Sequence, residues 1–179
     1  MPISRVAYRY AKPLFDLAQE KGQLEQVYED MKLISNVCKE NKILRVALKN
    51  PVIRGFKKRA VLQQLFAEKV QPFTLNLLML MADKNRANVL FDISKAFAEL
   101  YDIAQNIQQV LVTSATTLDE ATLAALQTKL SNELGKRVVL TAKENPDLIG
   151  GLIVQIGNTQ IDLSIKNSLQ RLTYQFVQS

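Results

Sequence analysis

The sequence predicts an α+β protein with an N-terminal six-helix bundle over residues 1–105 and a small C-terminal α/β domain over residues 106–179. In the first part, apolar side chains recur every three or four residues, as in amphipathic helices, whereas the second part alternates like strands. The first part holds 17 basic and 11 acidic residues, so it carries the whole net charge of +6. Four of the six glycines lie in the last 74 residues, which indicates more turns there.

Six helical segments are expected in the first part, at residues 4–21, 24–38, 43–48, 57–68, 72–82 and 89–107. The first should be capped by Ser4 and should end before Gly22, because serine favours helix starts and glycine favours helix ends. Pro13 falls inside this segment and predicts a kink without a break, since the apolar stripe continues beyond it. Asn50-Pro51 should end the third segment, because the residue before proline avoids helical angles.

The second part should contain four strands and two helices. The strands are expected at residues 110–115, 137–142, 152–156 and 160–163, and the first of the helices at 118–134. Gly157-Asn158 is typical of a tight hairpin turn between the last two strands. Asp162 or Ser164 should cap the last helix. That helix carries Ile165, Leu169, Leu172, Phe176 and Val177. A core this small is marginal in stability, so we expect this part to be stabilised by binding a partner.

The missing residue types exclude several classes of enzyme. The chain has no histidine and a single cysteine, so it lacks a Ser-His-Asp or Cys-His nucleophile and any histidine metal site. The spacing of Gly150, Gly151 and Gly157 fits neither a dinucleotide fingerprint nor a P-loop. Cys38 lies on the apolar stripe of the second helix and is interpreted as a packed core thiol. The sequence therefore offers no catalytic residue, metal site or cofactor site.

No segment has the length of a membrane span. The longest apolar block, Leu77 to Ala82, has six residues, whereas about 20 are needed to cross a bilayer. The first 22 residues carry charges throughout, unlike a signal peptide. We therefore expect a soluble or at most peripheral protein. The single cysteine cannot form an internal disulfide, which indicates a reducing compartment.

A run of basic residues is the strongest charge feature of the sequence. It consists of Lys42, Arg45, Lys49, Arg54, Lys57, Lys58 and Arg59. No acid interrupts the sequence between Glu40 and Glu68, so the run can attract phosphates. Phe56 is the only aromatic residue within it, and no RNP, KH or zinc-finger pattern accompanies it. A basic nucleic-acid-binding module stays open as the alternative, but a solvated face toward an acidic protein or a membrane surface is favoured.

Two helices offer apolar faces to a partner. One face of the first helix carries small and aromatic side chains: Tyr10, Ala11, Leu14 and Ala18. The segment Leu75 to Ala82 is apolar nearly all round, and such a helix is either fully buried or covered by a partner. Both interpretations stay open, although Met79 and Met81 favour a docked helix, because methionine adapts to its neighbours.

Short motifs along the whole chain occur in the order found in one known family. They are Ala7-Tyr8-Arg9-Tyr10-Ala11-Lys12-Pro13-Leu14-Phe15; Asn50-Pro51 with Lys57; Asn76-Leu77-Leu78 followed by Asn85-Arg86; Val112-Thr113-Ser114-Ala115 with Leu118; Asp147-Leu148-Ile149-Gly150-Gly151; Ile156-Gly157; and Ile161-Asp162-Leu163-Ser164-Ile165. On these residues the chain resembles the δ subunit family of bacterial F-type ATP synthases, which includes the mitochondrial oligomycin-sensitivity-conferring protein. The most specific signature consists of Gly150, Gly151, Gly157, Asp162 and Ser164. Pro13 departs from the family, which usually has a helix-friendly residue there.

The resemblance implies a non-catalytic stator subunit that links the F1 head to the b-subunit stalk, so that rotor torque is coupled to ATP synthesis and proton transport. It implies a peripheral protein at the cytoplasmic face of the bacterial inner membrane. Residues 1–105 would bind the N-terminal helix of an α subunit in a groove between the first and fifth helices, and residues 106–179 would bind the b subunits. Carried onto this sequence, the groove is lined by Tyr10, Ala11, Leu14, Ala18, Asn76, Leu77 and Leu80. No cofactor, small-molecule substrate or nucleic acid is expected.

Overall fold

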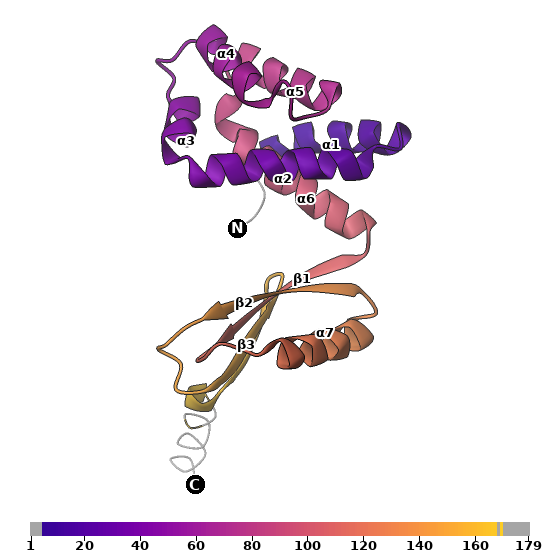
Figure 1. The fold of residues 1–179 in the computed structure, drawn as a ribbon, viewed down its shortest axis with the longest axis vertical. Helices are drawn as coiled ribbons and strands as arrows, with labels where there is room; N and C mark the ends of the chain where they lie inside the picture. Colours follow the sequence, from indigo (N-terminus) through magenta and orange to yellow (C-terminus); the bar gives the residue numbers. More distant parts are fainter. Residues whose placement is uncertain (1–4, 168, 170–179) are drawn as a thin grey trace. The chain divides into compact units, whose positions relative to one another are not determined.

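The computed structural model describes residues 5–167 and 169 (Figure 1). The chain divides into two compact units, residues 1–101 and 102–179. The sequence analysis placed this division after residue 105, where helical periodicity ends. In the structure it falls inside the last helix of the first unit, which runs from Leu90 to Ala104.

The described part of the first unit consists of helices joined by short turns. They are α1 (Arg5–Glu20), α2 (Leu24–Glu40), α3 (Lys42–Lys49), α4 (Gly55–Phe66), α5 (Pro72–Asp83), the 3-10 helix η1 (Ala87–Val89) and α6 (Leu90–Ala104). α1 continues through Pro13 without a break, as predicted. α3 ends before Asn50, which has extended backbone angles as expected of a residue before proline. α4 begins two residues earlier than predicted, directly after Arg54 in extended conformation.

The end of α6 corrects one boundary. The sequence analysis extended this helix to Ile107, but the structure ends it at Ala104 and places Ile107 in a strand. Asn106 has a φ of 56°, a left-handed conformation that does not continue a helix. Its carbonyl also accepts a hydrogen bond of 3.1 Å from the Arg137 N–H, which begins the pairing of two strands.

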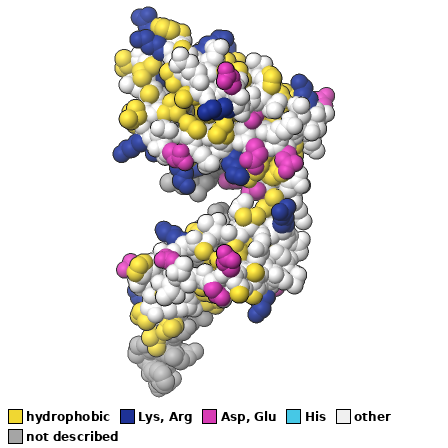
Figure 2. Space-filling model, viewed as in Figure 1, with side chains coloured by type: hydrophobic (Ala, Val, Ile, Leu, Met, Phe, Trp, Pro, Cys, Tyr) yellow, Lys and Arg dark blue, Asp and Glu magenta, His cyan; other side chains and the backbone are white. Residues whose placement is uncertain are grey.

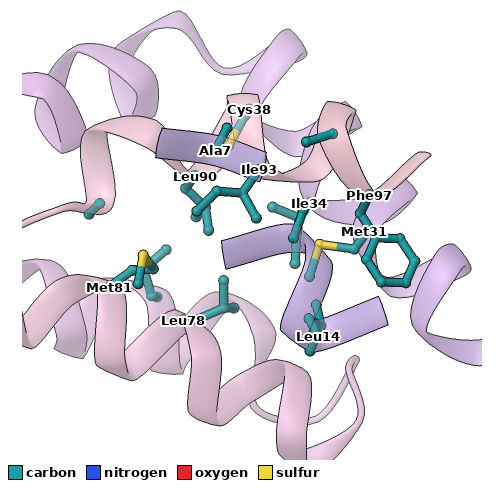
Figure 3. Packing of buried hydrophobic residues seen from close by; sticks show 14 of the residues in the cluster. Ala7, Leu14, Met31, Ile34, Cys38, Leu78, Met81, Leu90, Ile93 and Phe97 are labelled. Carbon is teal, nitrogen blue, oxygen red and sulfur yellow. The ribbon is translucent and has the colours of Figure 1, made fainter. Parts of the chain in front are cut away.

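The core of the first unit is one cluster to which every helix from α1 to α6 contributes. Phe97 of α6 lies beside Met31 and Ile34 of α2, and all three are at least 99% buried (Figure 3). Cys38 is equally buried, and burial raises the pKa of its thiol. The prediction that Cys38 is a core thiol is therefore confirmed. This shared core fixes the helices relative to one another and makes their outer faces a rigid surface.

The second unit contains a four-stranded mixed sheet and a covering helix. Its elements are β1 (Ile107–Ser114), α7 (Glu120–Leu134), β2 (Arg137–Glu144), β3 (Gly151–Ile156) and β4 (Thr159–Ser164). The strand order is β2-β1-β3-β4, with β1 and β2 parallel and the other pairs antiparallel. The parallel pair needs a crossover, which α7 supplies. β3 and β4 form the predicted hairpin, whose turn holds Gly157 at a φ of 58°.

The last predicted helix is described only at its start. Residues 165–167 and 169 are helical. The Asn167 N–H donates a hydrogen bond of 3.2 Å to the Ser164 hydroxyl, which is the N-cap contact expected of a serine there. The rest of that helix, with Leu172, Phe176 and Val177, lies outside the described residues, as does the predicted cap Ser4.

Candidate partner-binding surface

Two side-chain contacts, one near each end of α5, link the α1 and α5 segments. At one end, the Arg86 guanidinium, just beyond α5, donates a hydrogen bond of 2.8 Å to the Tyr10 hydroxyl and lies 5.9 Å from its ring centroid. At the other end, the Lys21 ammonium, just beyond α1, lies 5.4 Å from the centroid of the Phe73 ring in the first turn of α5. The two helices therefore run antiparallel.

The structure separates the seven predicted groove residues into two groups. Asn76 is exposed, Leu80 is 45% exposed, and Tyr10 and Leu77 are half-buried. The other three lie in the core instead of on an open surface: Ala11 is 0%, Leu14 5% and Ala18 0% exposed. The stripe along α1 is the face on which this helix packs, so its centre is covered by the other helices and only its margin reaches solvent.

Two accessible residues were missed by the sequence analysis. Leu17 on α1 and Phe73 on α5 are half-buried apolar side chains. Leu17 lies on the same helical row as Tyr10 and Lys21, and both of these residues contact the α5 region. The spacing of three or four residues along this row is the sequence signal that could have identified Leu17. We call the accessible set the α1/α5 surface. It consists of Tyr10, Leu17, Phe73, Asn76, Leu77 and Leu80.

The position of α5 is fixed by polar and steric contacts. Asp30 on α2 is 7% exposed, and its Oδ2 accepts a hydrogen bond of 2.8 Å from the N–H of Gln71, the residue before α5. Burial raises the pKa of Asp30, and the Gln71 N–H opposes this shift. Near the other end of α5, a Cβ on Gly55 would lie 2.7 Å from the Ala82 carbonyl oxygen, so only glycine lets α4 approach this closely.

Two members of the basic run serve the fold. Lys58 is only 4% exposed, and its ammonium donates a hydrogen bond of 2.9 Å to the Leu48 carbonyl at the end of α3. Arg59 forms an ion pair of 2.8 Å with Asp83. The expectation of a solvated basic face is therefore corrected at one position, because Lys58 is a buried residue of α4. The exposed members are Lys42, Lys49, Arg54, Lys57 and the ion-paired Arg59.

The glycine signature of the second unit is structural. Gly151 has a φ of 83°, and a Cβ there would lie 2.9 Å from the Ser164 Cα. A Cβ on Gly150 would lie 2.7 Å from a side chain of the last helix. The Asp162 carboxylate accepts the Ser164 N–H at 2.9 Å, where β4 leads into that helix. With the turn at Gly157, all five signature residues shape the hairpin and its exit.

Residues 5–167 and 169 contain neither a candidate metal site nor a candidate membrane span. This part of the chain contains no group of three or more His, Cys, Asp or Glu side chains that could hold a metal ion. None of the helices described in it is long and apolar enough to cross a membrane.

Residues 6–176 match the family model described as ATP synthase delta (OSCP) subunit. The chain belongs to this family. The ATP synthase subunit delta of Cytophaga hutchinsonii is 38% identical over 99% of this chain and 97% of that protein. That of Symbiobacterium thermophilum is 39% identical over 93% of this chain and 90% of that protein. A chain of the Toxoplasma gondii mitochondrial ATP synthase hexamer, 23% identical, has the same fold, with a TM-score of 0.77 over 97% of this chain and 98% of that one.

Membership in the delta (OSCP) family confirms the resemblance that the motifs indicated. The chain is a non-catalytic stator subunit of an ATP synthase. Its functional surfaces are therefore those that bind other subunits, and the α1/α5 surface is the first candidate.

Proposed function

We propose that this subunit joins the catalytic head of an F-type ATP synthase to its peripheral stalk. Residues 1–105 act as a six-helix bundle that binds the N-terminal helix of an α subunit, and residues 106–179 bind the b subunits. The complex holds the subunit at the cytoplasmic face of the bacterial inner membrane, where rotor torque is coupled to ATP synthesis and proton transport. The observation that carries this proposal is the α1/α5 surface.

The α1/α5 surface has the properties that a docked amphipathic helix requires. Its apolar side chains are partly exposed, and Leu80 retains 45% of its accessible area. A docked helix binds through apolar anchors spaced three or four residues apart. On α5, Phe73, Leu77 and Leu80 recur at the same spacing, so they can line one side of the docking surface. Because α5 is held by the Asp30 and Gly55 contacts, the surface is formed before the partner arrives, which lowers the entropy lost on binding.

The second unit supports stalk binding through its exposed strand β4. Ile161 and Leu163 pair with Val154 and Leu152 of β3, so they point to the same face as the small core of this unit. They are nevertheless 44% and 60% exposed. Apolar side chains on the core face of a sheet favour a covering element, and the b subunits are the proposed one.

The test is calorimetric titration of the full chain with a synthetic peptide of the partner α subunit's N-terminal helix. Leu80→Asp should weaken binding about 10- to 100-fold, because a leucine covered on binding contributes about 1.5–3 kcal/mol. Val61→Asp on α4 is the matched control, since Val61 is 42% exposed and is not one of the residues of the α1/α5 surface, and it should bind normally. Leu14 is unsuitable for the test because a charge there would enter the core.

Two results would overturn the α1/α5 assignment. One is the absence of binding to the folded wild-type chain. The other is equal affinity of the wild type and Leu80→Asp. The nucleic-acid alternative is tested with Lys57→Glu, which changes an exposed cation and spares the buried Lys58. Binding to duplex DNA that falls steeply with salt and with this substitution would favour that alternative.

A further inference from the structure

A second apolar surface lies on α3, the following loop and the first turn of α4. Ile43, Val46, Val52 and Phe56 are 86%, 59%, 83% and 61% exposed. Among the described residues of α1 to α6 and their connecting loops, the only other large apolar side chain with comparable exposure is Ile103 at the end of α6, at 76%. Exposed apolar side chains gathered in one place, unlike single ones, mark an interaction site. We call this region the α3/α4 surface.

The α3/α4 surface is hollowed. One cavity of about 450 Å³ is lined by Lys42, Ile43, Val46, Ala47, Asn50 and Ile53. Another of about 540 Å³ is lined by Val52, Ile53, Arg54, Phe56 and Lys57. Ile53 lines both, so the two hollows adjoin. Each is large enough to receive side chains of a partner.

Internal contacts hold this surface in shape. The Val52 N–H donates a hydrogen bond of 2.9 Å to the Asn50 side-chain oxygen, which sets the turn between α3 and α4. The buried Lys58 ammonium ties α4 to the end of α3 through the Leu48 carbonyl. Gly55 packs α4 against α5. The hollows are therefore preformed features of the fold.

The rim of the surface is positively charged. Lys42, Arg54 and Lys57 line the hollows, and Lys49 follows Val46 by three residues on α3; all four are exposed. Within the described part of the chain, no carboxylate forms an ion pair with any of the four. In Figure 2, basic and hydrophobic side chains are interspersed at the corner that α3 and α4 occupy in Figure 1. An occupant of this surface must therefore match apolar hollows and a cationic rim together.

We propose that the α3/α4 surface binds an acidic amphipathic helix of another protein chain. The apolar face of that helix would fill the two hollows, and its flanking Asp and Glu side chains would meet the cationic rim. A bilayer surface offers no fixed side chains that match the shape of preformed hollows. A nucleic acid is disfavoured because Phe56 is the only aromatic residue here, whereas nucleic-acid sites use several. A second copy of this chain would bring two cationic rims together. This binding is additional to that proposed for α1/α5.

The test is site-specific photo-crosslinking within the assembled ATP synthase that contains this subunit. Val46→benzoylphenylalanine should crosslink to a protein segment with helical apolar periodicity and flanking Asp or Glu, identified by mass spectrometry. Gln64→benzoylphenylalanine, at an exposed position on α4, is the matched control and should give no such product. No protein product at position 46, a lipid or nucleic-acid adduct, a second copy of this chain, or a segment without acids would each overturn the proposal.

Charge reversal on the rim tests the chemistry of recognition. Lys42→Glu, Lys49→Glu and Lys57→Glu together should lower the crosslink yield at position 46 about tenfold, because three solvent-exposed charge pairs become repulsive. Lys69→Glu, at an exposed position outside the surface, should leave that yield unchanged. An unchanged yield in the triple variant would overturn the proposal. Leu80→benzoylphenylalanine reports separately on the α1/α5 surface, so failure of one assignment is distinguishable from failure of the other.

Discussion

The helical unit and the α/β unit differ in how completely their apolar residues are covered. Among the described residues, the helical unit buries 20 apolar side chains in one cluster. Among its own described residues, the α/β unit buries only four apolar side chains, Val110, Val112, Val138 and Val154, and α7 contributes none of them. The first unit can therefore present rigid outer faces to partners. The second has a sheet whose core face is incompletely covered, so its stability should depend more on what binds it.

The units also use polar groups differently. In the helical unit, buried Asp30 and Lys58 each fix a helix end through one hydrogen bond to backbone. In the α/β unit, the strands pair through their backbones, and glycines allow close approach at the hairpin. Substitutions should therefore act through cavities and lost anchors in the first unit, and through backbone strain in the second.

The largest expected effect comes from equal truncations in the two cores. Leu90→Ala should lower the free energy of unfolding by about 3–5 kcal/mol, because Leu90 is fully buried and leaves a cavity. Leu130→Ala on α7 removes the same atoms from a half-buried site and should cost about 1–2 kcal/mol. Urea unfolding followed by circular dichroism measures both. Equal losses would show that the α/β core is as well packed as the helical one.

A glycine pair tests strain in the second unit. Gly151→Ala should cost about 2–3 kcal/mol, since its φ of 83° disfavours alanine and its Cβ would clash with the Ser164 Cα. Gly135→Ala is the control, because its φ is 62° but nothing lies within 4 Å of its Cβ, and it should cost about 1 kcal/mol. Hydrogen exchange of the β3–β4 hairpin should rise only in Gly151→Ala. A similar rise in both variants would mean that the contact with β4 is unimportant.

A pair of adjacent lysines distinguishes an anchor from a surface charge. Lys58→Met keeps the buried stem but leaves the Leu48 carbonyl without its donor, which should cost about 1–2 kcal/mol. Lys57→Met should be neutral, because Lys57 is exposed. Thermal melts of the two variants make the measurement. If Lys58→Met and Lys57→Met have the same melting temperature, the Lys58 contact does not contribute to the stability of the helical unit.

Sequence periodicity predicted the order of the segments, the hairpin turn at Gly157 and the burial of Cys38, because these depend on local spacing. It did not show which margin of the α1 stripe remains open. That depends on helices distant in sequence, and Ala11 and Leu14 are covered by them. The burial of Lys58 was readable, since it begins the row of Leu62 and Phe66 on α4. The sequence analysis nevertheless assigned Lys58 to a solvated face, because a charged lysine side chain is rarely buried.

The smallest effect concerns the pH dependence of the Asp30 anchor. Burial raises the pKa of Asp30 in the folded chain, so the folded state holds its proton more tightly than the unfolded state does. The resulting stability is present below about pH 4, the ordinary range for aspartate, and is lost as pH rises through the folded pKa. Asp30→Asn keeps an acceptor for the Gln71 N–H but cannot titrate. The wild type should therefore gain stability relative to Asp30→Asn on acidification from pH 7 to 3.5, as measured by urea unfolding. A relative loss would mean that the ionised carboxylate is the stabilising form, and the helical unit would then depend on a buried charge at the start of α5.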